Sequence, residues 1–355
     1  MRNSIRNTIL FIVILAVLCL SGCGKASEYE QAMAALESGD YAVAAEAFEA
    51  LGDYEDSREQ AAEARLLAEK QADYEKALSL SAGGSYDEAA ELFLALGDYL
   101  DSARLAAECR QQALEASYAE AVSLFNAGDH EKAKCFFLLN PEYKNSGLYL
   151  KAIDLAGCKA GDRVSFGSYP QDSSGSPAPR QWQILRAEEG RLLLLSELGL
   201  DSMRFHKDLY PFWADSELRQ WLNGSFLTSA FTGDEQQLIQ VSAIETPGYY
   251  SELGLYMGGP DTEDKVFLLS KEELREYLPE DADRLCLPSE YALSAGAGTD
   301  EDGHCFWWTR SPGNHHGKIC VINPNGYLNP DGRVLYTYIC LRPAVWVNIR
   351  DLTLE

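Results

Sequence analysis

The sequence predicts a chain of two parts, an all-α arm of helical repeats and a following α+β domain. Three observations support this prediction. A period of 45 and then 44 residues runs through residues 28–158. Short alternating apolar runs separated by Gly, Pro and Asp take over from about residue 161, and all six tryptophans lie after residue 180. A period of this size is typical of stacked supersecondary units, and alternating runs are typical of strands.

The first 22 residues are typical of a signal peptide. Arg2 and Arg6 precede an apolar run at residues 9–20, which is shorter than the roughly 20 residues that a spanning helix needs. The small residues before Cys23 resemble the lipobox of bacterial lipoproteins. The resemblance implies cleavage before Cys23, diacylation of its sulfur and a lipidated linker at residues 23–27, so that the protein would lie on the outer side of the cell membrane. An ordinary secretory signal is the alternative.

Composition limits the class of partner. The chain has 355 residues, and its 46 % hydrophobic content is enough for a core in each part. Its formal net charge of −25 is spread over both parts. An acidic surface repels phosphate backbones and anionic lipid headgroups, so we expect no nucleic-acid partner and no polybasic membrane signal. Anchoring is therefore expected from the lipid on Cys23 alone.

Seven cysteines remain once the signal peptide and Cys23 are set aside, and an odd number cannot all pair within the chain. Cys109 and Cys135 lie on apolar helical stretches, where we expect small buried thiols. In the second part an oxidising exterior would permit one or two disulfides, and the sequence does not assign their pairing. The cysteines in question are Cys286, Cys305, Cys320 and Cys340.

The arm contains three units, each with a glycine turn followed by apolar residues at helical spacing. The turns are Gly39-Asp40-Tyr41, Gly84-Ser85-Tyr86 and Gly128-Asp129-His130. This pattern predicts a helical hairpin in each unit. Asp56 and Asp101 are expected to cap longer helices. Residues 57–80 contain no Gly or Pro, which predicts one long helix that runs into the next unit.

The elements at residues 39–48 and 84–93 resemble the tetratricopeptide repeat family in their Gly, aromatic, Ala and Phe positions. The repeat is longer here than the 34 residues of that family. The resemblance implies a scaffold with a concave face that binds a protein or peptide. The alternative is a spacer that lifts the second domain away from the membrane.

The second part has the sequence pattern of a sheet that is interrupted by helices. The runs at residues 163–167, 181–186, 191–196 and 266–270 predict strands. Helices are expected near residues 215–223 and 271–277, with Ser216 and Ser270 as their caps.

Residues 213–226 closely resemble a bacterial domain of unknown function, DUF6273, which is common in surface and secreted proteins. Further matching segments follow the order of that family, at residues 166–171, 182–185, 268–270, 307–313 and 341–347. The resemblance covers about residues 161–349. It implies the C-type-lectin-like fold that formylglycine-generating enzymes share.

The resemblance also allows a test for catalysis. Formylglycine-generating enzymes use a pair of copper-binding cysteines near the C-terminal end, but Cys340 has no second cysteine close to it in sequence. This departure argues against oxidase chemistry. Because no Ser/His/Asp series, phosphate loop or CxxC pair is evident elsewhere, we predict no catalytic residues. A metal- or cysteine-dependent enzyme is the alternative function.

Loops of the second part supply the predicted ligand-binding residues, because loops on a rigid scaffold carry most binding functions. They are His304, Asn314, His315, His316, Asn325 and Tyr327, with Tyr249, Tyr250 and Tyr256 as further exposed aromatics. The segments at residues 323–325 and 329–331 carry the oxygens that calcium prefers, but they also suit hairpin turns. No cofactor is expected, with calcium as the alternative. A metal site would need three of the loop histidines and cysteines to converge.

Seven residues are expected to stabilise the domain and not to contact a ligand. They are Trp213, Arg219, Trp221, Trp308, Arg310, Arg342 and Trp346. The arginines stand beside tryptophans in apolar motifs, where guanidinium groups order a core through carbonyls and stacking. Trp221 is expected to be buried.

These observations together predict a lipid-anchored extracytoplasmic binding or scaffold protein. Its repeats would contact a protein or peptide, and its second domain would contact a protein or a cell-envelope glycan.

Overall fold

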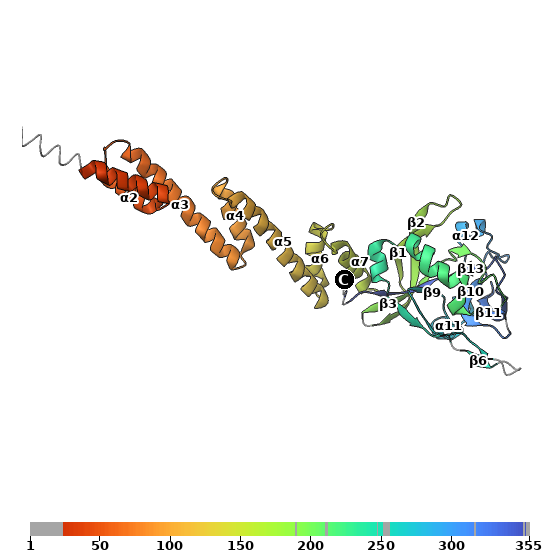
Figure 1. Cartoon of the computed structure of the whole chain (residues 1–355). Coiled ribbons are helices and arrows are strands. Elements are labelled where there is room, and N and C mark those ends of the chain that lie inside the picture. The colour runs from red at the N-terminus through yellow and green to blue at the C-terminus, as the bar shows by residue number, and fades with distance from the viewer. Residues whose placement is uncertain are drawn as a thin grey trace, which may run out of the picture. The chain divides into compact units, whose positions relative to one another are not determined.

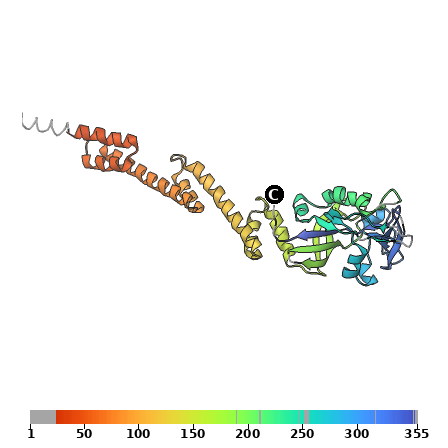
Figure 2. The same ribbon diagram turned by 60° about the horizontal axis from the view of Figure 1, so that its bottom comes forward.

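The structure is a computed structural model that describes residues 24–188, 190–209, 212–246, 248–250, 256–315, 317–350 and 352. The predicted signal peptide and Cys23 lie outside these residues. The chain divides into two compact units, Met1–Ala119 and Glu120–Glu355. Helices occupy residues 24–156 and strands dominate the region that follows, which confirms the prediction of an all-helical and then a sheet-rich part (Figure 1, Figure 2). No helix among the described residues is long and apolar enough to span a membrane.

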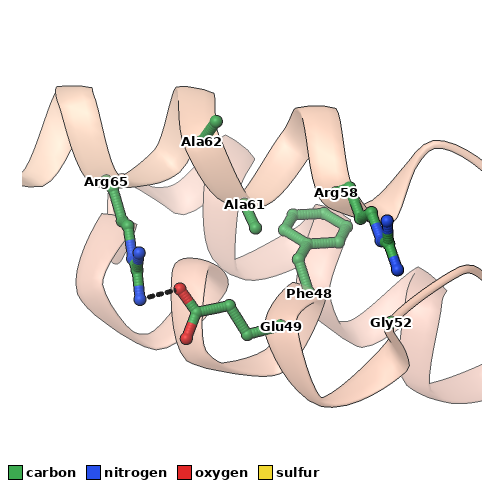
Figure 3. Close-up of a pocket in the computed structure, with 7 residues that line it drawn as sticks. All are labelled: Phe48, Glu49, Gly52, Arg58, Ala61, Ala62 and Arg65. Carbon is green, nitrogen blue, oxygen red and sulfur yellow. Dashed lines mark ion pairs between the residues drawn. The ribbon is translucent and has the colours of Figure 1, made fainter.

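Five helices form the first unit and lead out of it. They are the helix at residues 24–38, α2 (Tyr41–Leu51), α3 (Ser57–Ala82), α4 (Tyr86–Leu96) and α5 (Ser102–Asn126). The long helix predicted at residues 57–80 is α3, which confirms that prediction. Arg65 of α3 forms an ion pair with Glu49 of α2 across the groove between these helices (Figure 3).

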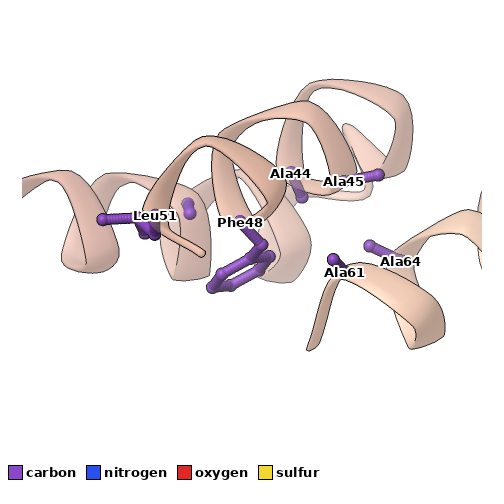
Figure 4. Packing of buried hydrophobic residues seen from close by; sticks show 7 residues of the cluster. Ala44, Ala45, Phe48, Leu51, Ala61 and Ala64 are labelled. Carbon is purple, nitrogen blue, oxygen red and sulfur yellow. The ribbon is translucent and has the colours of Figure 1, made fainter. Parts of the chain in front are cut away.

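Two small apolar clusters hold this unit together. The first joins three helices through Ala32, Ala44, Ala45, Phe48, Leu51, Ala61 and Ala64 (Figure 4). The second contains Ala77, Ala89, Ala90, Phe93, Leu96, Ala106 and Cys109. Helix α3 contributes Ala61 and Ala64 to the first cluster and Ala77 to the second. One long helix therefore belongs to two consecutive helical repeats. Its alanines allow the partner helices to approach closely.

The glycines singled out in the sequence occupy equivalent turns. Gly39, Gly84 and Gly128 have φ values of +87°, +85° and +83°. Each is followed two residues later by the first residue of a short helix, α2, α4 or α6 (His130–Leu139). Because a left-handed φ is nearly free of strain only for glycine, the turn explains the recurrence of this residue.

A second turn also recurs, and here the left-handed residue is not glycine. Glu55, Leu100 and Lys144 have φ values of +49°, +49° and +47°. In each of the three helical repeats, a fully buried serine lies two residues after the left-handed residue. Its hydroxyl donates to the carbonyl of the tyrosine before the turn. The three bonds are Ser57 to Tyr54 at 2.5 Å, Ser102 to Tyr99 at 2.6 Å and Ser146 to Tyr143 at 2.7 Å. The bond offsets the roughly 1 kcal/mol that a left-handed non-glycine residue costs.

The predicted capping role of Asp56 is wrong. Asp56 occupies the N-cap position of α3, but its carboxylate accepts no backbone N–H and instead accepts the hydroxyl of Tyr29. This bond lowers the pKa of Asp56. Asp101 likewise accepts the hydroxyl of Tyr74 at 2.6 Å. The tyrosine hydroxyl is favoured over the backbone N–H groups as the donor, because each tyrosine ring is held edge-on against a buried phenylalanine of the same repeat.

The predicted burial of the helical cysteines is half right. Cys109 is 2 % exposed within the second cluster, as expected. Cys135 of α6 is exposed, and its thiol donates to the carbonyl of Glu131. The prediction is wrong here because the buried stripe of α6 is formed by Ala133 and Phe137.

The second unit begins with a helical hairpin of α6 and α7 (Ser146–Ala156). Phe137 of α6 stacks on Tyr149 of α7, with ring centroids 4.8 Å apart and an interplanar angle of 5°. Two five-stranded sheets follow. The first has the order β1 (Arg163–Pro170), β2 (Pro177–Glu188), β3 (Arg191–Ser196), β14 (Ala344–Asn348) and β9 (Val266–Phe267), and all its pairings are antiparallel. The blue C-terminal strand β14 runs beside the green strands in Figure 2.

The second sheet has the order β12 (Leu328–Arg333), β11 (Lys318–Ile322), β10 (Trp307–Pro312), β13 (Cys340–Leu341) and β4 (Asp201–Ser202). Only the β10–β13 pairing is parallel. Two small ribbons pair β5 (Ser242–Ile244) with β8 (Thr262–Asp264) and β6 (Tyr249–Tyr250) with β7 (Tyr256–Met257). The predicted strands correspond to β1, β2, β3 and β9, although β9 ends three residues early.

Short helices connect the strands. They are η1 (Trp213–Asp215), α8 (Glu217–Trp221), the π-turn η2 (Leu222–Phe226), α9 (Leu227–Ala230), α10 (Gly233–Leu238), α11 (Lys271–Tyr277), η3 (Asp281–Arg284) and α12 (Glu290–Ser294). The two predicted caps are confirmed: Ser216 Oγ accepts the backbone N–H of Arg219, and Ser270 Oγ accepts that of Glu273. The predicted helix at residues 215–223 is divided between η1, α8 and η2.

Four fully buried tryptophans fill the core, and every indole N–H has an acceptor, as expected when an indole is buried. The bonds run from Trp182 to the carbonyl of Phe166, from Trp213 to the carboxylate of Asp264, from Trp307 to the carbonyl of Arg284 and from Trp308 to the carbonyl of Met203. The indole rings therefore fill the core, and their N–H groups fix how each ring is oriented within it.

Arg310 of β10 lies between the two sheets. Its Nη1 donates to the carbonyl of Leu268 at 2.7 Å, and its two terminal nitrogens form a bidentate pair with Glu273. Glu273 also accepts the backbone N–H of Ser270 to complete the capping box of α11. The Arg310 side chain is only 4 % exposed. One guanidinium thus joins β10 of the second sheet to the segment that follows β9 of the first.

Replacing Arg310 should therefore be costly. We expect Arg310→Met to lower the free energy of unfolding by about 3 kcal/mol, since Glu273 and the carbonyls of Leu268 and Glu245 lose their donor. Arg163 pairs with Glu197 at an exposed position, and Arg163→Met should cost less than about 1 kcal/mol. Urea unfolding of the full chain, followed by tryptophan fluorescence, measures both values. Equal losses in the two variants would contradict the proposed role of Arg310.

Glu235 ties the helical hairpin of this unit to the sheets. Its Oε1 accepts Lys151 Nζ of α7 at 2.7 Å and Gly167 N of β1 at 3.2 Å, and its Oε2 accepts Thr232 N at 2.9 Å. Its side chain is 8 % exposed. Burial opposes the charge, but the bonds from Lys151 and Thr232 outweigh burial and hold the pKa of Glu235 below its ordinary value.

A lowered folded pKa gives a defined pH dependence. The contribution of Glu235 is fully present above the unfolded pKa of about 4.3 and is lost as pH falls through the folded pKa. We expect Glu235→Gln to reduce stability at pH 7 by about 2 kcal/mol, with the difference from the wild type shrinking below about pH 4. Asp154→Asn, which removes the exposed pair with Lys134, is the matched control. A difference that stays constant from pH 7 to pH 3 would contradict this assignment.

Candidate ligand-binding site

Trp221 is half-buried, so the prediction that it is buried is wrong. The buried stripe of this helical segment is filled by Leu218, Leu222 and Phe226, which repeat every four residues. Trp221 falls beside that stripe, at the point where α8 widens into the π-turn η2. Turns of this kind occur frequently at functional sites.

The exposed part of Trp221 lines a cavity of about 540 Å³, which is within the range of small-molecule sites. The lining residues are Ser202, Met203, Arg204, Glu217, Trp221, Ala295 and Thr337. They come from β4 and the residues after it, from α8, from the end of α12 and from the segment between β12 and β13. Segments that lie far apart in the sequence therefore build one cavity.

The polar groups around the cavity offer both donors and acceptors. Arg204 Nε donates to Glu217 Oε2 at 3.0 Å, which leaves further guanidinium and carboxylate capacity on each side chain. Ser202 is 9 % exposed, and its Oγ has no hydrogen-bond partner among the described residues. A buried hydroxyl without a partner is costly, so a ligand group that bonds to Ser202 would relieve this cost.

Two contacts hold the cavity wall in place. Ser202 of β4 pairs with Cys340 of β13, which fixes its backbone. Tyr169 donates to the carboxylate of Asp201 at 2.7 Å and lies edge-on to Trp221, with ring centroids 6.5 Å apart. Burial raises the pKa of Tyr169 and that of Asp201. The Trp221 ring therefore packs against a buried tyrosine that is itself anchored by a hydrogen bond.

The structure places His304 in a different setting from the other predicted ligand residues. Ligand atoms of His304, Asp300 and Asp302 lie within 4.8 Å of one another, and this is the only such group found among the described residues. Neither His315 nor any of the described cysteines joins it. The backbone N–H of His304 already bonds to the Asp300 carboxylate at 2.9 Å.

The remaining predicted ligand residues lie in turns beside β11. Asn314 N donates to the carbonyl of Pro330, Lys318 N donates to the carbonyl of His315, and Tyr327 N donates to Asn325 Oδ1. Tyr327 and Tyr256 are each 52 % exposed. His316 and the side chains of Tyr249 and Tyr250 lie outside the described set. None of the described members of this group lines the Trp221 cavity.

The segments considered for calcium use their oxygens locally. Asn323 Oδ1 accepts the amide of Asn329 at 3.1 Å, and Asn329 Oδ1 accepts the backbone N–H of Asp331 at 2.9 Å. Gly326 N donates to the carbonyl of Asn323 in the turn between β11 and β12. The segment at residues 323–325 is therefore a turn, as the alternative interpretation expected, whereas residues 329–331 lie within β12, so the expectation of a turn there is wrong.

Most of the expected structural residues lie in the core. Trp213 and Trp308 are fully buried, and Arg310 and Arg342 are 4 % and 3 % exposed. Arg219 Nε pairs with the buried Asp264 at 2.7 Å. Trp346 is half-buried beneath the Arg191 guanidinium, 4.3 Å from the ring centroid.

A second cavity, of about 450 Å³, lies in the first unit between α2 and α3 (Figure 3). Its two arginines already have acidic partners, because Arg65 pairs with Glu49 and Arg58 pairs with Asp53 at 2.7 Å. It also lacks an exposed aromatic ring. The Trp221 cavity is therefore the stronger candidate for ligand recognition.

Residues 189–349 match the family described as a domain of unknown function, DUF6273. The chain carries a DUF6273 domain. The matched segment contains every residue that lines the Trp221 cavity. The first sheet extends beyond the matched segment, because β1 pairs with β2 and β2 pairs with β3, and both β1 and β2 precede residue 189. No curated protein and no solved structure gave a match.

Sequence reasoning singled out only Trp221 among the lining residues, and it missed the four polar ones, which are Ser202, Arg204, Glu217 and Thr337. Glu217 and Trp221 stand four positions apart on a short helix, which places them on one face and is a signal that could have been used. Ser202 and Thr337 reach the cavity only through the pairing of β4 with β13, a long-range contact that no local pattern reveals.

Proposed function

We propose that this protein is a lipid-anchored extracytoplasmic binding protein whose DUF6273 domain holds a sugar ring of a cell-envelope glycan in the Trp221 cavity. The observation that carries the proposal is the half-buried Trp221 ring in one cavity with the hydroxyl of Ser202, which has no hydrogen-bond partner in the described part of the chain. A sugar ring offers C–H groups to an aromatic face and hydroxyls that both donate and accept. Arg204, Glu217 and Ser202 supply the matching polar groups.

The finer features of the proposal rest on the sequence. A C-type-lectin-like fold for the domain and tetratricopeptide-like character for the helical units follow from the resemblances described above. We propose that the helical units contact a protein or peptide, and that the protein binds without catalysing a reaction. The net charge of −25 supports a partner that is neither nucleic acid nor an anionic lipid surface.

Glycan binding can be tested with the full-length protein in detergent. Isothermal titration with peptidoglycan disaccharide fragments and with glucosamine oligosaccharides should show saturable binding to the wild type. We expect Trp221→Ala to weaken binding at least tenfold, which corresponds to about 1.4 kcal/mol, because the stacking face is removed. Trp346→Ala, at a half-buried tryptophan outside the cavity, should bind as the wild type does.

Two outcomes would contradict the glycan proposal. Equal weakening by Trp221→Ala and Trp346→Ala, in variants that thermal unfolding shows to be folded, would mean that the glycan does not bind in the Trp221 cavity. Binding of an envelope peptide but of no glycan, lost in Trp221→Ala, would keep the site and replace the ligand class.

Anchoring can be tested separately. If the sulfur of Cys23 carries the lipid, Cys23→Ser should release the mature chain from the membrane fraction or leave its signal uncleaved. Membrane fractionation and the mass of the mature N-terminal peptide measure this. A conservative change at Cys19, which lies inside the apolar run, is the control and should leave both readouts as in the wild type. Unaltered fractionation and processing in Cys23→Ser would contradict lipidation.

A further inference from the structure

Arg204 lines the Trp221 cavity with most of its donors unused. Its Nε donates to Glu217 Oε2 at 3.0 Å. Neither of its terminal nitrogens, Nη1 and Nη2, has a hydrogen-bond partner among the described residues. Because Nε is occupied, the open edge of the guanidinium is the one that Nη1 and Nη2 form. This planar pair of donors matches the two oxygens of a carboxylate.

The backbone around Arg204 is held on two sides. Phe205, the next residue, is fully buried. Its N–H donates to the carbonyl of Val334 at 2.9 Å, and Leu218 N of α8 donates to the carbonyl of Phe205 at 3.3 Å. The guanidinium is therefore attached to a fixed segment, and its ion pair with Glu217 orients it without using its outer edge.

Two cations share the carboxylate of Glu217. Arg204 bonds to Oε2, and Lys207 Nζ lies 3.9 Å from Oε1. The neighbouring Asp208 faces His206, with 3.5 Å between Oδ2 and Nε2, and its side chain is 74 % exposed to solvent, where its field is screened. The charge of Glu217 is thus compensated at both oxygens, which lowers the repulsion that an anionic ligand would meet. This compensation matters in a chain with a net charge of −25, because its surface otherwise repels anions.

The second polar group of the cavity is the hydroxyl of Ser202, which is 9 % exposed and has no hydrogen-bond partner among the described residues. The preceding Asp201 does not accept it, because the Asp201 carboxylate accepts the hydroxyl of Tyr169 and the backbone N–H of Ser202, each at 2.7 Å. A buried hydroxyl and an open guanidinium edge therefore line the same cavity as the Trp221 ring. Both groups suit a ligand that is rich in oxygen.

We propose that the sugar held in the Trp221 cavity carries a carboxylate, which the Nη1 and Nη2 groups of Arg204 bind as a bidentate pair. This inference rests on the glycan-binding function proposed above and narrows its ligand class to acidic sugars. Two kinds of envelope sugar supply the group, a uronic acid and a muramic acid whose lactyl carboxylate is free of peptide. One guanidinium edge satisfies the two oxygens of a carboxylate, but not the three of a phosphate monoester.

The test compares each acidic sugar with its own methyl ester, which keeps the ring and removes the charge. Isothermal titration of the full-length protein in detergent uses two disaccharides of N-acetylglucosamine, one with glucuronic acid and one with peptide-free N-acetylmuramic acid, together with the methyl ester of each. We expect the wild type to bind one of the acids at least tenfold more tightly than its ester, because the ester cannot form the bidentate ionic pair. The acid that shows this preference identifies the source of the carboxylate.

Variants of Arg204 test whether its open edge causes the preference. Arg204→Gln should bring the affinities for acid and ester within about twofold of each other, and Arg204→Lys, which keeps the charge without the planar fork, should retain part of the preference. Arg163→Gln removes the same charge from an exposed arginine outside the cavity and should keep the full preference. The Arg204 side chain is 47 % exposed, so neither change there should prevent folding, which thermal unfolding checks.

Three results would overturn the inference and leave glycan binding in place. The first is equal affinity of the wild type for both acids and their esters, with binding still weakened in Trp221→Ala. The second is a preference for the acid that persists in folded Arg204→Gln, because the carboxylate would then bind elsewhere. The third is tighter binding of glucose 6-phosphate than of glucuronic acid. If none of these sugars binds, the glycan proposal fails, and this inference fails with it.

Discussion

The bidentate pair between Arg310 and Glu273 is the interaction on which the sheet-rich part depends. Arg310 belongs to β10, at the centre of the second sheet, and its guanidinium bonds to the carbonyl of Leu268 just after β9 of the first. Glu273 holds the start of α11 at the same point. Burying a guanidinium costs least where several acceptors converge on it, as they do at Arg310. The requirement to satisfy one charge therefore fixes two sheets and a helix relative to one another.

The sequence predicted the parts of the fold that local chemistry determines. Gly39, Gly84 and the apolar spacing that follows each of them specify the helices because a left-handed turn and a helical stripe are local features. Ser216 and Ser270 were identified as caps for the same reason. Asp56 was predicted wrongly because its partner, Tyr29, lies 27 residues away and outcompetes the nearby backbone N–H groups. Local rules identify a capping position, but tertiary contacts decide which donor reaches it.

The candidate site also shows that local sequence rules do not determine long-range contacts. Trp221 was expected in the core because its neighbours are apolar at helical spacing. Its ring stays half-buried for two reasons. The buried stripe is already filled by Leu218, Leu222 and Phe226, and the helix widens into the π-turn η2 directly after Trp221. The other wall of the cavity arises from the pairing of Ser202 with Cys340. Neither a change of helical period nor a pairing across 138 positions is encoded in a short motif.

Charge compensation distinguishes Arg342 and Arg180, which are 3 % and 2 % exposed, from the arginines of this core that pair with a carboxylate. Arg310 has Glu273 and Arg219 has Asp264, so each cation is matched by a carboxylate. Arg342 has no ion pair among the described residues, although it is as deeply buried as Arg310. Its Nε instead donates to the carbonyl of Ser196 at 3.0 Å, and its guanidinium lies 5.0 Å from the centroid of the Trp307 ring. A carbonyl and an aromatic face therefore take the place that a carboxylate has beside Arg310 and Arg219, and the burial of this cation rests on weaker contacts than an ion pair.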